Sequence, residues 1–297
     1  MEHQRLVAGV ELGGTKCIAV LARESRIVAR TQWPTSGPSE TLGAINQQLR
    51  EWQGAQPFEA LGIASFGPLS LQRTAANYGV MLDTPKPGWS GVELLQLRKG
   101  LEVPFGLETD VTAAAMAEAR WGASIGCTDH VYITIGTGVG GGVISGRRPV
   151  RGSVHPEVGH IRVRRAAGDT FRGLCPFHGD CIEGLVSGPA LARRAEAPLE
   201  TLPEDHPLWG RMVGETAELL TALYLLCSPQ RIVIGGGVVQ TRPWLFPLLT
   251  EAVATRLNGY PLRQTAQELA SIIVPPVLGG DAGPLGSVVV GLSALEA

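Results

Sequence analysis

The sequence lacks a strong net charge and any long hydrophobic run. Its 25 Lys and Arg residues nearly balance 27 Asp and Glu residues, which leaves a net charge of −2 at pH 7. This balance argues against broad electrostatic capture of nucleic acid or of an anionic membrane, while a small local anion site stays compatible with it. The longest apolar stretches, such as residues 270–280, are too short to span a bilayer, and this one contains Pro275 and Pro276. No export signal is visible at the N-terminus, so we expect a cytoplasmic protein with no membrane or nucleic-acid partner.

Cysteine is scarce and glycine is abundant. Five cysteines are an odd number, and a chain of 297 residues can fold without disulfides, so we expect reduced thiols. The 39 glycines are about twice the average usage, and glycine lets backbone amides approach a ligand closely. A hydrophobic content of 44% with 18% charged residues indicates a folded chain, and its length favours two domains over one.

Segments typical of strands and helices alternate along the chain, which predicts an α/β fold. Residues 7–22 and 131–146 both read as strand, glycine turn and strand, a little under half a chain apart. This faint duplication predicts two similar halves that face each other, with a ligand in the cleft between them. Further expected elements are a strand at 270–277 and helices at 42–53, 92–99, 111–122, 209–226 and 284–297.

Two glycine turns expose backbone amides that suit phosphate oxygens. The first, residues 13–16 (GGTK), adds a hydroxyl and a cation, and the second spans residues 136–141 (GTGVGG). One such turn is more often an ordinary hairpin, but a third glycine cluster at 235–237 favours a nucleotide site. Residues 136–141 also match G-x-G-x-x-G, yet a returning strand rather than a helix follows them, which argues against a dinucleotide site.

A loop rich in cysteine and histidine has the spacing of a metal site. Cys175, His178 and Cys181 are separated by two residues each, so one loop can wrap a tetrahedral ion. His160, fifteen residues upstream of the first cysteine, can supply the fourth ligand, and His155 is the rival candidate. Four protein ligands would make the zinc structural, because no position stays open for a substrate. The alternative is two free thiols and a surface histidine.

Three carboxylates are candidates for chemistry or substrate binding. Glu157 and Glu183 lie next to proposed metal ligands, where rigid carboxylates can hold sugar hydroxyls; the alternative for each is a solvated surface acid. Asp110 precedes an alanine-rich helical segment and is either a plain helix N-cap or a base that accepts a hydroxyl proton during phosphoryl transfer.

Taken together, these motifs resemble the ROK family of bacterial sugar kinases, within the superfamily that joins actin, hexokinase and the heat-shock chaperone ATPases. The resemblance covers essentially the whole chain. It is carried by residues 11–16 (ELGGTK), 109–115 (TDVTAAA), 135–140 (IGTGVG), 157–160 (EVGH), 179–183 (GDCIE) and 234–237 (IGGG). The finer similarity is to the ROK fructokinases, through residues 65–68 (SFGP), 84–89 (TPKPGW), 175–178 (CPFH) and 187–190 (SGPA).

The resemblance implies a two-lobed actin-like (ribonuclease H-like) kinase fold with an active-site cleft between the lobes. Residues 1–112 would form a small lobe completed by the C-terminal helix 284–297, and residues 113–283 a large lobe with the zinc loop and the nucleotide site. It also implies a homodimer that transfers the γ-phosphoryl group of ATP to the 6-hydroxyl of D-fructose, releases ADP, and uses Mg²⁺ and structural zinc.

The resemblance also assigns roles to residues. Asp110 is the base; Glu157, His160 and Glu183 hold sugar hydroxyls, and His160 binds zinc through its other nitrogen. The zinc ligands are then His160, Cys175, His178 and Cys181. The implied nucleotide-binding residues are Gly13, Gly14, Thr15, Lys16, Thr137, Gly138, Pro189, Gly235, Gly236 and Gly237.

Three departures from the wider family favour fructose over glucose. Glu11 replaces the usual Asp, His178 replaces a cysteine of the zinc loop with altered spacing, and Thr109 stands where many glucose-specific members carry Asn. Two alternatives stay open: another ROK hexose or N-acetylhexosamine kinase, such as a glucokinase or mannokinase, or a non-catalytic sugar-sensing regulator. The family's repressors carry a helix-turn-helix region before the kinase-like part, and we expect none before a turn that starts at Gly13.

Overall fold

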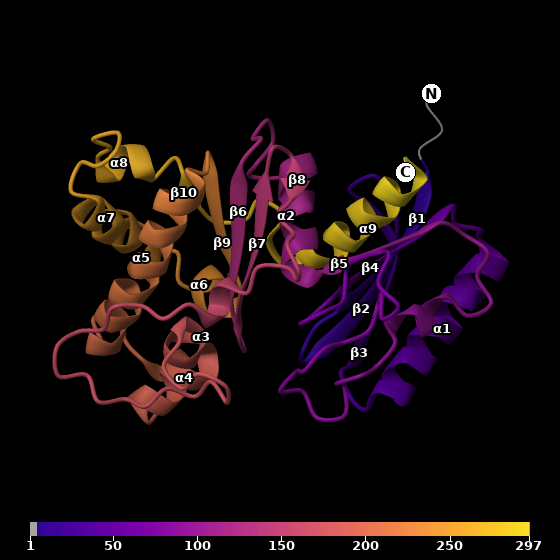
Figure 1. Cartoon of the computed structure of the whole chain (residues 1–297), viewed down its shortest axis with the longest axis horizontal. Helices are drawn as coiled ribbons and strands as arrows, with labels where there is room; N and C mark the ends of the chain where they lie inside the picture. The colour runs from indigo at the N-terminus through magenta and orange to yellow at the C-terminus, as the bar shows by residue number, and fades with distance from the viewer. Residues whose placement is uncertain (1–4, 297) are drawn as a thin grey trace. The chain divides into compact units, whose positions relative to one another are not determined.

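A computed structural model describes residues 5–296 of the chain, which divides into two compact units (Figure 1). Unit 1 comprises Met1–Ile125, Pro149–Pro156 and Gly280–Ala297, and unit 2 comprises Gly126–Arg148 and Glu157–Gly279. Each unit contains a five-stranded sheet with helices packed on it, so the predicted α/β class is confirmed.

The sheet of unit 1 has the strand order β3-β2-β1-β4-β5. Strands β1, β4 and β5 are parallel, and β2 and β3 are antiparallel to their neighbours. The strands are β1 (Leu6–Leu12), β2 (Lys16–Arg23), β3 (Arg26–Pro34), β4 (Ala60–Ser65) and β5 (Phe105–Thr109). The helices are α1 (Pro38–Ala55), α2 (Asp110–Trp121) and α9 (Ala282–Leu295), with the 3₁₀ helix η1 (Leu94–Arg98).

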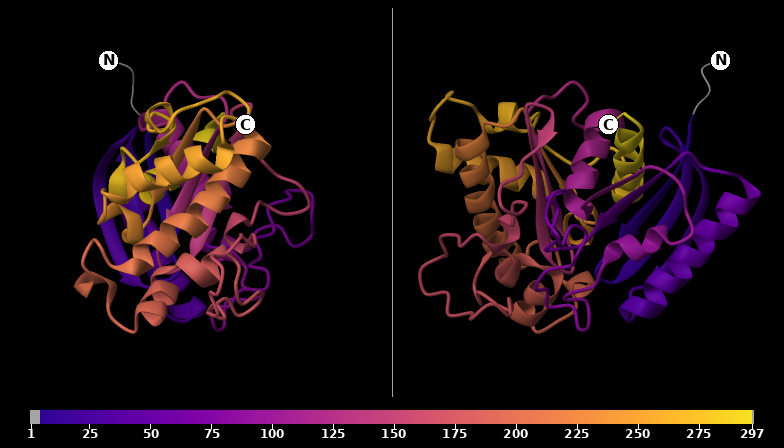
Figure 2. Two further views of the ribbon diagram at one scale, coloured as in Figure 1. Left: turned by 90° about the vertical axis from the view of Figure 1, so that its left-hand side faces the viewer. Right: turned by 45° about the vertical axis from the view of Figure 1, so that its right-hand side comes forward.

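Helices cover both faces of this sheet (Figure 2). Successive side chains of a strand point to opposite faces. Val10 of β1 accordingly belongs to a buried cluster with Ile45 and Leu49 of α1. Val7 of the same strand belongs to the cluster on the other face, with Val288 of α9. Because β1 is apolar on both sides, it lies in the interior of unit 1 and fixes the position of the turn that follows it.

The sheet of unit 2 repeats the plan of an antiparallel hairpin followed by a parallel strand. Its order is β10-β9-β6-β7-β8, with β6 antiparallel to β7 and parallel to β9. The strands are β6 (His130–Ile135), β7 (Val139–Ser145), β8 (Arg148–Pro149), β9 (Arg231–Gly235) and β10 (Ile273–Val274). The helices are α3 (Ile182–Val186), α4 (Gly188–Ala195), α5 (Pro207–Cys227), α6 (Gly237–Gln240), α7 (Leu245–Leu257) and α8 (Ala266–Leu269), with the 3₁₀ helices η2 (Val158–His160) and η3 (Leu199–Thr201). A further 3₁₀ helix, η4 (Gly279–Asp281), lies where the chain passes from unit 2 back to unit 1.

Several elements differ from the sequence-based expectations. The edge strand β3 was not foreseen, and the segment expected as a helix at 92–99 forms only the short 3₁₀ helix η1. The strand expected at 270–277 is only two residues long, because Pro275 and Pro276 cannot donate to a strand ladder. Residues 113–125 and 149–156 pack in unit 1, whereas the predicted boundary at 112 places them in the large lobe.

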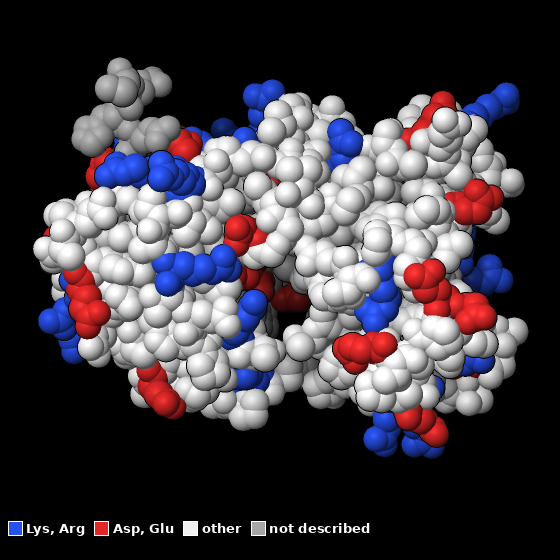
Figure 3. Space-filling view, turned by 180° about the vertical axis from the view of Figure 1, so that it is seen from behind, with Lys and Arg blue, Asp and Glu red and all other residues white. Residues whose placement is uncertain are grey.

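The surface agrees with the balanced charge of the chain. On the face drawn in Figure 3, basic and acidic side chains are interspersed. Among the helices of residues 5–296, none is long and apolar enough to cross a membrane.

Candidate active site and metal centre

The first glycine turn joins β1 to β2, and each of its carbonyl oxygens accepts a hydrogen bond from another part of unit 1. Thr35 Oγ1 donates to Gly13 O at 2.6 Å, and Thr35 N donates to Thr15 O at 2.9 Å. Lys86 Nζ donates to Gly14 O at 2.6 Å. Within residues 5–296 the amides of Gly14 and Thr15 donate to no acceptor. The turn therefore presents two adjacent N–H groups, which suits an anion.

Two carboxylates lie at the carboxyl ends of parallel strands of the same sheet. Glu11 lies near the end of β1, and Asp110 follows the last residue of β5. Burial and, to a smaller extent, the charge of Asp110 raise the pKa of Glu11 to about 7. Burial also raises the pKa of Asp110 to about 6, although hydrogen bonding from the Val111 amide opposes the shift. An ionised Asp110 is therefore a stronger proton acceptor than an ordinary aspartate.

Asp110 is not the N-cap of its helix. Thr109 holds that position, and its Oγ1 accepts from Thr112 N at 3.2 Å. Asp110 is the first residue of α2, half-buried, with Oδ1 accepting from Val111 N at 2.9 Å. The N-cap interpretation of Asp110 is therefore wrong, although an acidic side chain in the first turn also suits the helix dipole.

The second glycine turn joins β6 to β7 in unit 2. Gly136 N donates to Gly138 O at 2.9 Å and closes the turn. Gly136 O accepts from Gly188 N at 2.7 Å, at the start of α4. The amide of Val139 donates to Glu183 Oε2 of α3 at 3.0 Å. In this turn a carboxylate therefore accepts the hydrogen bond of a neighbouring amide. Glu183 contacts the turn and is also close in sequence to the proposed metal ligand Cys181.

The third glycine cluster lies against this second turn. Gly236 has a φ of +90°, and a Cβ there would come within 2.3–2.6 Å of the Ile135 backbone, so only glycine fits. A Cβ on Gly136 would lie 4.0 Å from Gly237 N. Unit 2 thus brings together the predicted nucleotide-binding residues Thr137, Gly138, Pro189, Gly235, Gly236 and Gly237.

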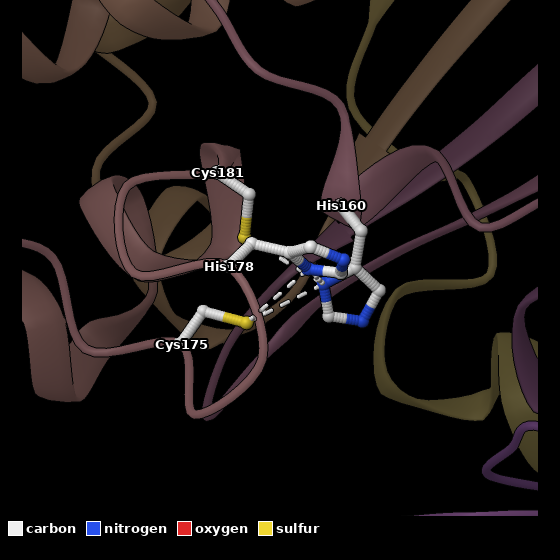
Figure 4. Close-up of side chains that lie close together, drawn as sticks. All are labelled: His160, Cys175, His178 and Cys181. Carbon is white, nitrogen blue, oxygen red and sulfur yellow. Dashed lines mark hydrogen bonds between the residues drawn. The ribbon is translucent and has the colours of Figure 1, made fainter.

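Four side chains of unit 2 converge as the metal hypothesis predicts (Figure 4). One ligand atom from each of His160, Cys175, His178 and Cys181 lies within 4.8 Å of the others. His160 Nδ1 is 3.6 Å from each sulfur atom and 3.3 Å from His178 Nδ1, and His178 Nδ1 is 3.7 Å from Cys175 Sγ. Burial raises the pKa of the Cys181 thiol to about 11, so holding it as a thiolate at neutral pH requires a bound cation.

His155, the rival fourth ligand, is not part of this cluster. It is buried in unit 1, where its Nε2 accepts from Leu69 N at 3.0 Å. His160 instead belongs to η2, whose first turn begins after Glu157, and His160 N donates to Glu157 O at 3.0 Å. The structure therefore places these two predicted sugar-binding residues in one tight turn. His160 directs Nδ1 into the cluster, which leaves Nε2 for another partner.

Thr35 and Lys86 contact the first glycine turn, and the sequence did not reveal either contact. Lys86 lies within the 84–89 motif that carries the fructokinase resemblance, so its position in that motif was the available signal. Thr35 follows β3 and has no local signal at all, because its role depends on a hydrogen bond across 22 residues of chain.

Comparisons with known proteins extend over nearly the whole chain. The model of the ROK family matches residues 7–292. A fructokinase from Pediococcus pentosaceus is 36% identical over 293 residues, which cover 98% of this chain and 99% of that protein. A fructokinase from Zymomonas mobilis is 36% identical over 302 residues, 99% of each chain. The crystal structure of a ROK family glucokinase from Streptomyces griseus, in complex with glucose and AMPPNP, is 26% identical and superimposes with a TM-score of 0.78 over 97% of this chain and 99% of that one. Because the family match runs from the first strand to the C-terminal helix, this chain belongs to the ROK family and has its two-lobed, actin-like fold.

Proposed function

We propose that this protein is an ATP-dependent fructokinase, which transfers the γ-phosphoryl group of ATP to the 6-hydroxyl of D-fructose and releases ADP. The observation that carries the proposal is the pairing, in unit 1, of an anion-receptive glycine turn with a carboxylate whose pKa is raised to about 6. The full-length similarity to fructokinases supports fructose as the acceptor.

Asp110 acts as the base in this reaction. It accepts the proton of the 6-hydroxyl while the new oxygen–phosphorus bond forms and the bond to the ADP leaving oxygen breaks. The transition state spreads negative charge over the γ-phosphoryl oxygens, so fixed donors and positioning supply most of the stabilisation. The amides of Gly14 and Thr15, with the Lys16 ammonium, are the donors that unit 1 offers. Mg²⁺ bound to ATP neutralises phosphate charge.

The sugar is held by the residues that surround the metal cluster. Glu157 and Glu183 accept hydrogen bonds from sugar hydroxyls, and His160 uses the Nε2 that faces away from the cluster. Thr137, Pro189 and the glycines 235–237 line the nucleotide site of unit 2. The family resemblance also supports a homodimer, which sedimentation equilibrium tests.

The metal of the cluster is structural zinc. Zn–S bonds of about 2.3 Å and Zn–N bonds of about 2.05 Å at tetrahedral angles place neighbouring ligand atoms about 3.3–3.8 Å apart. Four of the six separations, at 3.3–3.7 Å, match that requirement, and all six lie within 4.8 Å. The ion would hold the loop between η2 and α3, which has little regular structure of its own, and so position His160 and Glu183.

A substrate panel tests the proposal. ADP release is measured with MgATP and, in turn, fructose, mannose, glucose and N-acetylmannosamine. We expect the highest kcat/KM with fructose. A higher kcat/KM with glucose or N-acetylmannosamine would identify the protein as another sugar kinase of this family. No turnover of any sugar, together with a gel shift on the protein's own upstream DNA, would favour a non-catalytic sugar-sensing regulator.

A further inference from the structure

Lysine is rare in this chain, and two of its three lysines lie at the first glycine turn. Lys16, Lys86 and Lys99 are the only lysines among 25 basic residues, so arginine supplies nearly all of the positive charge. Lys16 follows the turn in sequence, whereas Lys86 reaches it from a loop 70 residues further along the chain. A lysine ammonium is a compact charge that can hydrogen bond to several backbone carbonyls at once.

The Lys86 ammonium bridges two segments of unit 1. Its Nζ donates to Gly14 O at 2.6 Å and to Thr35 O at 3.3 Å. The side chain is half-buried, and within residues 5–296 it forms no ion pair with a carboxylate. Its positive charge is therefore not neutralised by the protein and adds to the field at the turn.

The loop that carries Lys86 is rigidly anchored. Residues 86–89 form a type II turn, in which Trp89 N donates to Lys86 O at 3.2 Å, Pro87 takes the second position and Gly88 has the required positive φ of +79°. The Trp89 ring is fully buried, and its Nε1 donates to Ser36 O at 3.1 Å. The backbone at Lys86 is thus held by its own loop, independently of the glycine turn.

The contact with Gly14 O determines where the next amide points. In a trans peptide the carbonyl and the following N–H point in opposite directions. When Lys86 holds Gly14 O, the N–H of Thr15 must point away from Lys86, toward the side where the turn has no protein acceptor. The charge also polarises the peptide, which makes Thr15 N–H a better donor.

We propose that Lys86 is a positioning residue of the nucleotide site: it fixes the Gly14 peptide so that the Thr15 amide faces a phosphate oxygen of ATP, and it supplies positive charge behind the turn. The proposal rests on the kinase function proposed above. It gives the 84–89 motif a role in binding nucleotide rather than sugar.

The test combines three substitutions of Lys86 with a matched control. Lys86→Met removes the donors and the charge, Lys86→Gln keeps a donor without the charge, and Lys86→Arg keeps both. Lys99→Met removes an exposed lysine of unit 1 away from the turn. The measurements are the KM values for MgATP and for fructose, the Kd of AMPPNP by calorimetry, and the thermal midpoint.

We expect Lys86→Met to raise the KM for MgATP and the Kd of AMPPNP by about tenfold, as for the loss of one charge-assisted hydrogen bond. The KM for fructose should stay within about twofold, Lys86→Gln should be intermediate, and Lys86→Arg should return to within about threefold of the parent. Because the charge contributes, the Kd of the parent should rise more steeply with salt than that of Lys86→Met.

An AMPPNP Kd for Lys86→Met within twofold of the parent would overturn the inference. So would a lower thermal midpoint with equal changes in both KM values, because that pattern indicates a purely structural role. Calorimetry measures nucleotide binding without sugar turnover. The inference about Lys86 can therefore fail while the kinase activity is confirmed, and it can hold while the kinase activity is absent.

Discussion

The two glycine turns of this protein have similar sequences and sit in equivalent hairpins, yet they are held in opposite ways. In unit 1, Thr35 and Lys86 bind the carbonyl oxygens of the turn, and two amides are left without acceptors among residues 5–296. In unit 2, a backbone amide of α4 binds Gly136 O, and the carboxylate of Glu183 takes the amide of Val139.

The difference shows that a glycine hairpin does not by itself determine which ligand it favours. The neighbours decide which backbone groups stay available and what charge surrounds them. Lysines beside the first turn favour a group with high negative charge, whereas a carboxylate beside the second lowers that preference. The following predictions test this contrast, from the largest expected effect to the smallest.

The largest effect is expected at Asp110, which directly follows a strand of the sheet that carries the first turn. Asp110→Asn keeps the acceptor for the Val111 amide but removes the base, so kcat should fall about 10²- to 10⁴-fold while the fold is kept. ADP release measures kcat, and circular dichroism checks the fold. Glu102→Gln, an exposed acid of the same unit, serves as the control and should stay within about twofold. A loss at Asp110 of less than about tenfold would contradict its role as base.

The geometry of the second turn should depend on the metal cluster, whereas that of the first turn should not. Cys181→Ser should lose the bound zinc and lower the thermal midpoint by about 5 °C or more, because the loop and Glu183 lose their anchor. Metal analysis by mass spectrometry and calorimetry measure the two effects. Cys227→Ser changes a thiol of unit 2 that lies outside the cluster, so this control variant should retain the bound zinc. Stoichiometric zinc in Cys181→Ser would exclude the proposed ligand set.

The pH dependence should report the environment of Asp110. Burial raises its pKa to about 6, so the ionised base is lost as pH falls through 6 rather than through the lower range of an exposed aspartate. We expect kcat/KM for fructose to be about tenfold lower at pH 5 than at pH 7, and initial rates in constant-ionic-strength buffers measure it. A profile that is flat between pH 5 and 7 would show that no group with this pKa limits the reaction.

The smallest effect is expected at Thr35, whose side chain contributes one neutral hydrogen bond to the first turn. Thr35→Val should raise the KM for MgATP about fivefold and cost about 1 kcal/mol of stability, because Gly13 O loses its hydroxyl partner. Thr31→Val removes a hydroxyl of strand β3 that donates to Gln48 of helix α1, away from the turn, and is the matched control. Equal KM values for the two variants would mean that Thr35 does not shape the nucleotide site.

Local sequence patterns predicted those parts of the site whose interacting residues are close together in the chain. The spacing of Cys175, His178 and Cys181 was sufficient to predict a cluster, because three ligands on one short loop can reach a common point wherever that loop lies. The glycine turns were predictable for a similar reason, since their geometry depends on a few consecutive dihedral angles.

Choices between similar candidates needed the tertiary structure. His160 was the first candidate for the fourth metal ligand and His155 its rival; His160 lies in the cluster, whereas His155 accepts from Leu69 N in unit 1. Asp110 and Thr109 both suit a helix start, and the bond from Thr112 to Thr109 decides which one caps α2. In each case the sequence leaves two candidates, and the contacts in the fold select between them.

The sequence by itself therefore determined the α/β class, the clustering of Cys175, His178 and Cys181 on one loop and the two hairpins, because periodicity, turn chemistry and residue spacing act over a few residues. The resemblance of its motifs indicated the family. Only the tertiary structure decided how each hairpin is held. Thr35, Lys86 and Glu183 come from 22 to 72 residues away, and packing of the surrounding strands and helices sets which polar atom they meet. Such partners leave no periodic or spacing signal in the chain, since hydrogen bonds across long loops depend on the whole packed unit.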